Sequence, residues 1–259
     1  MRPGGDTRTS LTGTAFARFW RPEVDERLAT GVEGFDSLVQ GGFPEGTVNL
    51  VGGPAGSGKS LFCLHFCHYG ARFRDEPSMY VALEETKASL SRVLRTFGMN
   101  AENLERTGRF LMIDLGELRV SGPEGSPIGF RELQEFLAPS LKSARAKRLV
   151  IDSLSAIGLH YPTPGEFRER LFAFSRFLRD QDVTTLLIAE SADSSGFAAH
   201  GVEEFIADSF VHLGLEEVKG ELRRTLTVRK MRFTKHDTTK HPMYITETGL
   251  VVAADEKVV

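Results

Sequence analysis

The segment Gly53–Ser60 reads Gly-Pro-Ala-Gly-Ser-Gly-Lys-Ser, a combination of residue types that can hold a phosphate. Glycines let backbone N–H groups turn inward around an anion, because no Cβ stands in the way. Lys59 would supply a mobile positive charge for the β- and γ-phosphates, and the Ser60 hydroxyl is a hard oxygen ligand that suits Mg²⁺. A glycine-rich turn that binds nothing is the alternative, which the Lys-Ser pair disfavours. The predicted triphosphate-binding residues are Gly53, Pro54, Ala55, Gly56, Ser57, Gly58, Lys59, Ser60 and Leu61.

A bound triphosphate also needs an acid to hold its Mg²⁺, and the run Arg148-Leu-Val-Ile-Asp152 ends in one. An aspartate at the end of a strand is often only a turn residue or a helix cap. Because a phosphate-binding segment is predicted in the same sheet, we interpret Asp152 and Ser60 as the residues that hold the metal.

Hydrolysis further needs a group that orients and deprotonates water. Glu84 and Glu85 follow the apolar run Met79–Leu83, and a carboxylate is a suitable general base. The alternative is that both acids lie near the start of a helix containing Leu90 and Leu94 and complement its dipole. Spacing alone slightly favours that alternative.

Short apolar runs alternate with segments of helical periodicity over most of the chain. Residues 130–141 and 167–178 each place apolar side chains on one helical face. Runs that are apolar on both faces are typical of buried parallel strands. These runs are Val48–Val51, Met79–Leu83, Phe110–Ile113, Leu149–Ile151 and Thr185–Ala189. The alternation predicts an α/β fold with a mainly parallel sheet and helices on both faces.

After Phe210 the pattern changes to strands with little helix between them, which predicts an antiparallel C-terminal extension of the sheet. The expected strands are Phe210–Leu213, Thr225–Arg232, Met243–Thr246 and Leu250–Ala253. Residues 1–25 mix Gly, Thr, Arg and Pro without periodicity, so we expect a flexible N-terminal arm followed by one domain over residues 26–259.

Composition limits the class of protein. The 259 residues contain 32 basic and 35 acidic side chains, a balance that argues against a generally basic nucleic-acid binder. No apolar run approaches the roughly 20 residues that span a bilayer, so we expect no membrane association. Two cysteines cannot form a disulfide framework, which favours a reducing, cytoplasmic setting.

Two weaker sequence signals have a structural interpretation as well as a functional one. Cys63, His65, Cys67 and His68 could suggest a metal, but a free cysteine in an apolar helix is usually a small buried hydrophobe. Residues 191–200 form a small, polar stretch without Lys or Arg, which argues against strong contacts with nucleic-acid phosphates.

Taken together, these motifs resemble the KaiC branch of the RecA superfamily of ATPases. The resemblance extends over about residues 27–253, with the motifs in the expected order. The matching segments are Arg27–Asp36, Gly41–Gly46, Gly53–Ser60, Tyr80–Thr86, Ile151–Ser153, Gly201–Asp208 and Lys230–Arg232.

The resemblance implies a RecA-like ATPase that assembles as a ring, usually a hexamer, with ATP between neighbouring subunits. The catalytic glutamate pair of the family falls on Glu84 and Glu85. Its Mg²⁺-associated acid falls on Asp152, and its phosphate-binding Lys and hydroxyl fall on Lys59 and Ser60.

The resemblance also implies residues that act from the neighbouring subunit. Lys230 and Arg232 match a Lys-x-Arg pair that reaches the phosphates of the neighbour's ATP. Arg224 and His236 match positions that line the same nucleotide from that side. The alternative for these cations is a solvated basic strand face.

Three departures from the family pattern matter. The circadian clock protein of the family has two ATPase domains, whereas this chain has one. Glu204 and Phe205 occupy the positions of a phosphorylated Ser-Thr pair, so we expect no autokinase activity there. Phe233 stands where the family often has Gly.

The leading hypothesis is a slow, Mg²⁺-dependent, regulatory or signalling ATPase whose ring state is the signal. A DNA-acting recombinase built on the same core is the second hypothesis. A nucleotide-dependent scaffold with little turnover, which binds a signalling partner such as a sensor kinase, is the third.

Overall fold

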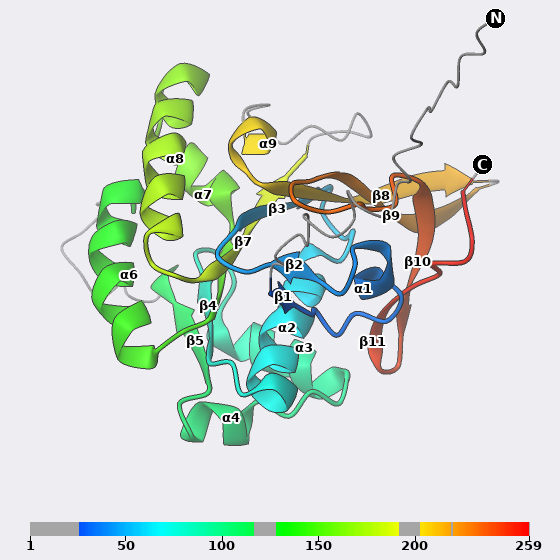
Figure 1. Cartoon of the computed structure of the whole chain (residues 1–259), viewed down its shortest axis with the longest axis horizontal. Helices are drawn as coiled ribbons and strands as arrows, with labels where there is room; N and C mark the ends of the chain where they lie inside the picture. The colour runs from blue at the N-terminus through cyan, green and yellow to red at the C-terminus, as the bar shows by residue number, and fades with distance from the viewer. Residues whose placement is uncertain (1–25, 117–127, 192–202, 219, 259) are drawn as a thin grey trace, which may run out of the picture.

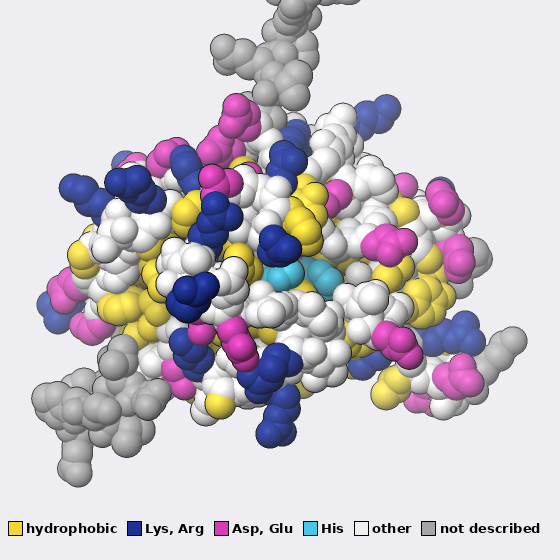
Figure 2. Space-filling view, turned by 90° about the horizontal axis from the view of Figure 1, so that it is seen from below, with side chains coloured by type: hydrophobic (Ala, Val, Ile, Leu, Met, Phe, Trp, Pro, Cys, Tyr) yellow, Lys and Arg dark blue, Asp and Glu magenta, His cyan; other side chains and the backbone are white. Residues whose placement is uncertain are grey.

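The computed structural model describes residues 26–116, 128–191, 203–218 and 220–258. The predicted arm over residues 1–25 and the expected loop from residue 192 onward lie outside the described residues. In the part of the chain that is described, no helix is long and apolar enough to cross a membrane. Figure 2 shows one face of the molecule, where Lys and Arg side chains lie among Asp and Glu.

A nine-stranded sheet runs through the described residues in the order β11-β10-β9-β8-β3-β7-β6-β4-β5 (Figure 1). Its parallel strands are β3 (Val48–Gly53), β4 (Ser78–Ala82), β5 (Phe110–Asp114), β6 (Arg148–Asp152), β7 (Thr184–Glu190) and β8 (Ser209–Val218). The antiparallel extension consists of β9 (Glu221–Met231), β10 (Lys240–Thr246) and β11 (Gly249–Val252). The predicted α/β fold, with its mainly parallel sheet and antiparallel C-terminal strands, is confirmed.

Helices cover both faces of the sheet, and each face has its own apolar cluster. One face is covered by α2 (Lys59–Tyr69), the π-helical turn η2 (Gly70–Arg74), α3 (Lys87–Thr96) and α4 (Glu102–Arg106). The other is covered by α6 (Phe130–Ala144), α7 (Leu154–Gly158), α8 (Pro164–Arg179) and α9 (Glu203–Ile206). Along β4, Tyr80 and Ala82 join the first cluster and Met79 and Val81 the second, which explains why the run is apolar on both faces.

The N-terminal described segment packs against the first face. It contains α1 (Phe35–Leu38) and a two-stranded sheet of β1 (Arg27–Leu28) and β2 (Phe43–Pro44). Phe35 contacts Phe62 of α2 edge-on, with ring centroids 4.9 Å apart.

Two boundaries differ from the predicted ones. The helix expected at 167–178 begins at Pro164, because the Thr163 hydroxyl accepts a hydrogen bond from the Glu166 N–H over 3.2 Å and caps the helix. The hairpin β8–β9 continues to the pair Val218–Glu221. Its described outer residues, among them Glu217 and Glu221, are largely exposed, so no buried apolar pattern marked them.

The parallel strands give the sheet two distinct edges. The carboxyl ends of β3, β4, β6 and β7 meet at what we call the carboxyl edge, and their amino ends meet at the amino edge. β3 rises by about 3.3 Å per residue, so Val48 and Gly53 at its ends are roughly 17 Å apart. Ligands of open α/β sheets bind outside the carboxyl ends of the strands, so a ligand of this chain is expected at the carboxyl edge.

Candidate nucleotide-binding site

The loop of residues 53–60, which we call the phosphate loop, joins β3 to α2 at the carboxyl edge. Gly58 has a φ of +105°, a backbone conformation that favours glycine. A Cβ on Gly53 would lie 2.1 Å from the Leu213 carbonyl oxygen, so this position has no room for a side chain. Helix α2 begins at Lys59 and directs its positive end at the loop. The strand–loop–helix context that the motif requires is present.

Lys59 is buried against this loop, and its Nζ donates a hydrogen bond to the Pro54 carbonyl oxygen over 2.9 Å. Burial lowers the pKa of Lys59, while the nearby carboxylates of Glu190 and Asp152 act in the opposite direction. Glu190 ends β7 and is paired in register with Gly53. The ammonium group is therefore held at the loop, between the ends of neighbouring strands.

Asp152, at the end of β6, accepts hydrogen bonds from two hydroxyl groups. Its Oδ2 accepts hydrogen bonds from the Ser60 Oγ over 2.8 Å and from the Tyr80 hydroxyl over 2.6 Å. Burial raises the pKa of Asp152, and the two hydrogen bonds oppose that rise. The hydroxyl of Ser60 and the carboxylate are hard oxygen donors within reach of each other, which fits Mg²⁺ held by few protein ligands and water. In the described residues, no group of three or more His, Cys, Asp or Glu forms another candidate metal site.

Glu84 and Glu85 are both exposed just beyond β4, but they have different partners. The Glu84 Oε2 accepts a hydrogen bond from the Ser153 Oγ over 3.1 Å, and this serine directly follows Asp152. The Glu85 Oε2 accepts one from the Ser89 Oγ of α3 over 2.9 Å. Glu84 is thus hydrogen-bonded at the end of β6. Glu85 is hydrogen-bonded to the first turn of the next helix, although its charge also acts on Asp152.

Arg224 contacts the phosphate loop of its own chain, since its Nε donates to the Gly56 carbonyl oxygen over 3.1 Å. The resemblance implies that Arg224 also lines the nucleotide of a neighbouring copy, which stays a prediction. His236 lies in the loop after β9, with its Nδ1 3.2 Å from the Thr234 carbonyl oxygen.

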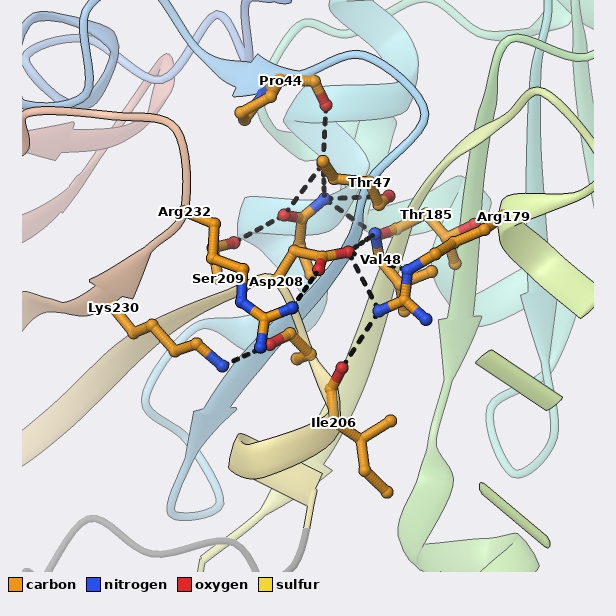
Figure 3. A network of polar contacts seen from close by, with 12 residues as sticks. Pro44, Thr47, Val48, Arg179, Thr185, Ile206, Asp208, Ser209, Lys230 and Arg232 are labelled. Atoms are coloured by element: carbon orange, nitrogen blue, oxygen red, sulfur yellow. Dashed lines mark hydrogen bonds and ion pairs between the residues drawn. The ribbon is translucent and has the colours of Figure 1, made fainter. Parts of the chain in front are cut away.

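Lys230 and Arg232 lie at the opposite, amino edge (Figure 3). The Lys230 Nζ donates to the Ala207 carbonyl oxygen over 2.6 Å, and the Arg232 Nη1 donates to the Asp208 Oδ1 over 3.1 Å. Asp208 in turn forms hydrogen bonds with the backbone of Val48, the first residue of β3. These two cations are therefore separated from their own phosphate loop by the length of a strand.

The loop after Arg232 has a backbone conformation that favours glycine, although the residue there is Phe233. Phe233 has a φ of +60° and is 70% exposed, and a left-handed conformation costs a non-glycine residue about 1–2 kcal/mol. Its carbonyl oxygen accepts a hydrogen bond from the Arg27 Nη2 over 2.8 Å, which ties the loop to β1.

Sequence reasoning missed four side chains that complete these networks. The Tyr80 hydroxyl was given no role, and the roles of Ser153, Arg179 and Asp208 depend on pairings between distant segments. A hydroxyl inside an otherwise apolar run was the one available signal, and it concerned Tyr80.

The cysteines of α2 lie in the core. Cys63 and Cys67 are fully buried and free, and burial raises the pKa of Cys67 beyond the physiological range. His65 accepts a hydrogen bond from the Leu250 N–H over 3.1 Å, and burial lowers its pKa to about 4. Burial and this hydrogen bond account for Cys63, Cys67 and His65 as packing residues.

The sequence profile of the family described as "ATPase: KaiC" matches residues 28–257. The class that the fold and the phosphate loop define is therefore a RecA-like, nucleotide-binding ATPase domain. The chain belongs to the KaiC family of ATPases.

Similar proteins of about the same length are known. The chain is 34% identical to a UPF0273 protein of Thermotoga maritima over 241 residues, which is 89% of this chain and 97% of the relative. It is 34% identical to the circadian clock oscillator protein KaiC of a Nostoc species, but spans only 44% of that protein. The crystal structure of a KaiC-like protein from Pyrococcus horikoshii superimposes with a TM-score of 0.77 at 35% identity, covering 88% of this chain and 98% of that one.

Proposed function

We propose that this chain hydrolyses ATP slowly, with Mg²⁺, at junctions between copies arranged head to tail in a ring. The observation that carries the proposal is that the charged residues lie at opposite edges of one sheet. Lys59 and Asp152 are at the carboxyl edge, and Lys230 and Arg232 are at the amino edge. One chain cannot bring both sets to one nucleotide, so a second copy supplies the missing cations.

At the carboxyl edge, the backbone N–H groups of the phosphate loop and Lys59 bind the phosphates. Ser60 and Asp152 would hold Mg²⁺, which neutralises charge on the phosphoryl oxygens when bound. Glu84 is the favoured base for the attacking water, because its bond to Ser153 keeps its carboxylate beside the end of β6.

From the neighbouring copy, Lys230 and Arg232 stabilise the negative charge that develops on the γ-phosphoryl group, which couples turnover to assembly. A contact between opposite edges is heterologous, and it forms a closed ring when the rotation between copies closes. The hexamer that the resemblance implies is our proposed ring. Arg224 shapes the phosphate loop from within the chain, and His236 lies beside the nucleotide on the neighbour's side.

We further propose a regulatory or signalling role, in which assembly driven by ATP presents the ring to a signalling protein. Glu204 and Phe205 have no hydroxyl to accept a phosphate, so the output is conformational and does not depend on autophosphorylation at α9.

Light scattering coupled to a phosphate-release assay tests this function over a range of protein concentrations. We expect ATP and Mg²⁺ to promote assembly, the rate per subunit to rise with assembly, and a metal chelator to abolish it. A single subunit that turns over fully at every concentration, or a wild-type rate for Arg232→Ala, would contradict the proposal. Single-stranded DNA added to the assay tests the recombinase hypothesis, which predicts stimulation that falls steeply with salt.

A further inference from the structure

The carboxylate of Asp208 lies between two arginines that come from different elements (Figure 3). Its Oδ1 accepts a hydrogen bond from the Arg232 Nη1 over 3.1 Å. Its Oδ2 accepts from the Arg179 Nε and Nη2, over 3.2 and 3.1 Å, and from the Val48 N–H over 3.0 Å. One oxygen is therefore fixed to the core of the domain, and the other faces Arg232.

Backbone hydrogen bonds fix Asp208 as well. Its N–H donates to the Val48 carbonyl oxygen over 2.7 Å, and its carbonyl oxygen accepts from the Arg232 N–H over 3.0 Å. Asp208 thus joins the start of β3 to the end of β9, and its side chain is only 8% exposed. The carboxylate is a fixed point against which the Arg232 side chain is held.

Arg232, in contrast, is accessible. Its side chain is 50% exposed and borders an open groove of about 480 Å³ between α8 and α9, where Phe172 and Phe205 also lie. A guanidinium group has five N–H donors, and within the described residues its side chain donates to Asp208 alone. The half-exposed guanidinium therefore keeps donors that a group from a second chain can accept.

We propose that Asp208 is the positioning residue of Arg232, and that Arg179 fixes Asp208 for this task. The proposal rests on the proposed function, in which Arg232 acts on the ATP of a neighbouring copy. Two guanidinium groups share one carboxylate, so the three side chains keep a net positive charge that a phosphate can attract. The Lys230 ammonium, held by the Ala207 carbonyl oxygen, adds to it.

Loss of the Asp208 charge would free a long side chain to sample other rotamers, and each departure removes the cation from the reacting phosphate. Because the phosphate loop lies at the other edge of the sheet, binding of ATP would not change. Misplacement of a positioned group by about 1 Å can cost a hundredfold in rate, and we expect a milder, roughly tenfold loss of kcat for Asp208→Asn.

Three variants test this step by phosphate release, titration with a fluorescent ATP analogue and thermal unfolding. Asp208→Asn should lower kcat about tenfold with unchanged affinity for the analogue. Arg179→Met leaves Asp208 and Arg232 in place but removes the anchor, and should lower kcat about threefold. The Arg179→Met variant tests the same positioning role if Asp208→Asn fails to fold. Arg176→Met, an exposed arginine of the same helix, is the matched control and should behave as wild type.

Mixed rings separate positioning from a general structural defect. A chain with Glu84→Gln and Glu85→Gln keeps ATP binding and its own Arg232, but cannot hydrolyse. In a random equal mixture with Asp208→Asn, about a quarter of the junctions combine an intact catalytic edge with a well-positioned Arg232. The rate should then be about a quarter of wild type, against about a twentieth without complementation.

The outcomes distinguish this inference from the proposed function. A wild-type kcat for Asp208→Asn, or a low kcat that the mixture does not raise, overturns the role of Asp208. When Arg232→Ala replaces Asp208→Asn in this mixture, the rate of phosphate release should also rise. If Arg232→Ala does not recover, action between copies is wrong, and the proposed function fails with it.

Discussion

The two edges of the sheet use charged residues in opposite ways. At the carboxyl edge, Lys59 and Asp152 are largely buried and bond to a carbonyl oxygen and to hydroxyl groups, with no ion pair to either within the described residues. Burial lowers the pKa of Lys59 and raises that of Asp152, so both are pushed toward their neutral forms. At the amino edge, Arg148 pairs with Glu76, and Arg232 shares Asp208 with a second arginine.

We interpret this difference as that between a proposed ligand site and a framework that holds the fold together. Buried charges that no close ion pair compensates destabilise a fold, and they are retained where a ligand supplies the missing charge. Paired charges hold elements of the fold together. Where one member of a pair is half-exposed, as Arg232 is, the pair also holds that side chain at the surface. The comparison therefore predicts opposite signs when charges are removed at the two edges.

The largest effect on stability is expected at the amino edge, for Arg148→Met. This guanidinium is fully buried, its Nη1 donates to the Ala29 and Phe66 carbonyl oxygens over 2.6 and 2.7 Å, and its Nε donates to Glu76 over 2.7 Å. Methionine leaves three acceptors without their donor, so unfolding should become easier by about 3–5 kcal/mol. Urea unfolding followed by circular dichroism measures this.

The exposed pair of Arg109 and Asp75 gives the control for that variant. Arg109→Met should change the free energy of unfolding by at most about 1 kcal/mol, because water screens an exposed pair. Equal losses for both substitutions would mean that burial of Arg148 is not what stabilises the amino edge.

The next effect concerns turnover at the carboxyl edge, where the two glutamates differ in their partners. Glu84→Gln should lower kcat by about a hundredfold with ATP binding retained, because it removes the proposed base beside the end of β6. Glu85→Gln should cost only a few-fold, since that carboxylate bonds to Ser89 of α3. Single-turnover phosphate release measures both. A larger loss for Glu85→Gln would assign the base to Glu85 instead.

The fold could be predicted from the sequence because local patterns specify it. The amphipathic run at 130–141 and the apolar run at 79–83 correspond to α6 and β4, since burial on one face or on both leaves a direct trace in the residue order. The polar tip of β8–β9 left no such trace, because cross-strand pairing stabilises it without burying an apolar face.

The candidate site could be predicted only in part, for the same reason. The phosphate loop is one contiguous segment whose glycines, lysine and serine act together, so its residue types alone point to a phosphate. The bond of Tyr80 to Asp152 and the position of Asp208 between Arg179 and Arg232 join residues far apart in the chain. Such pairings depend on strand order, which the pattern of a single strand does not specify.

The smallest expected effect has the opposite sign and tests the comparison most directly. Burial raises the pKa of Asp152 above its unfolded value of 3.8, so its carboxylate costs stability at neutral pH. Asparagine keeps the shape and accepts the hydrogen bonds of Ser60 and Tyr80 without the charge. Asp152→Asn should therefore stabilise the nucleotide-free chain at pH 7 by about 1 kcal/mol, which raises Tm by about 2–4 °C. The gain should shrink as the pH falls through the raised pKa toward 3.8, where the wild-type carboxyl group is itself neutral.

With ATP and Mg²⁺ the order of the two Tm values should reverse, because only the wild type gains binding energy from the metal. Asp255→Asn, at an exposed position, is the control and should leave Tm unchanged at every pH. A lower Tm for Asp152→Asn without nucleotide would mean that the hydroxyl groups of Ser60 and Tyr80 already compensate the charge, and that the carboxyl edge is a framework like the amino edge.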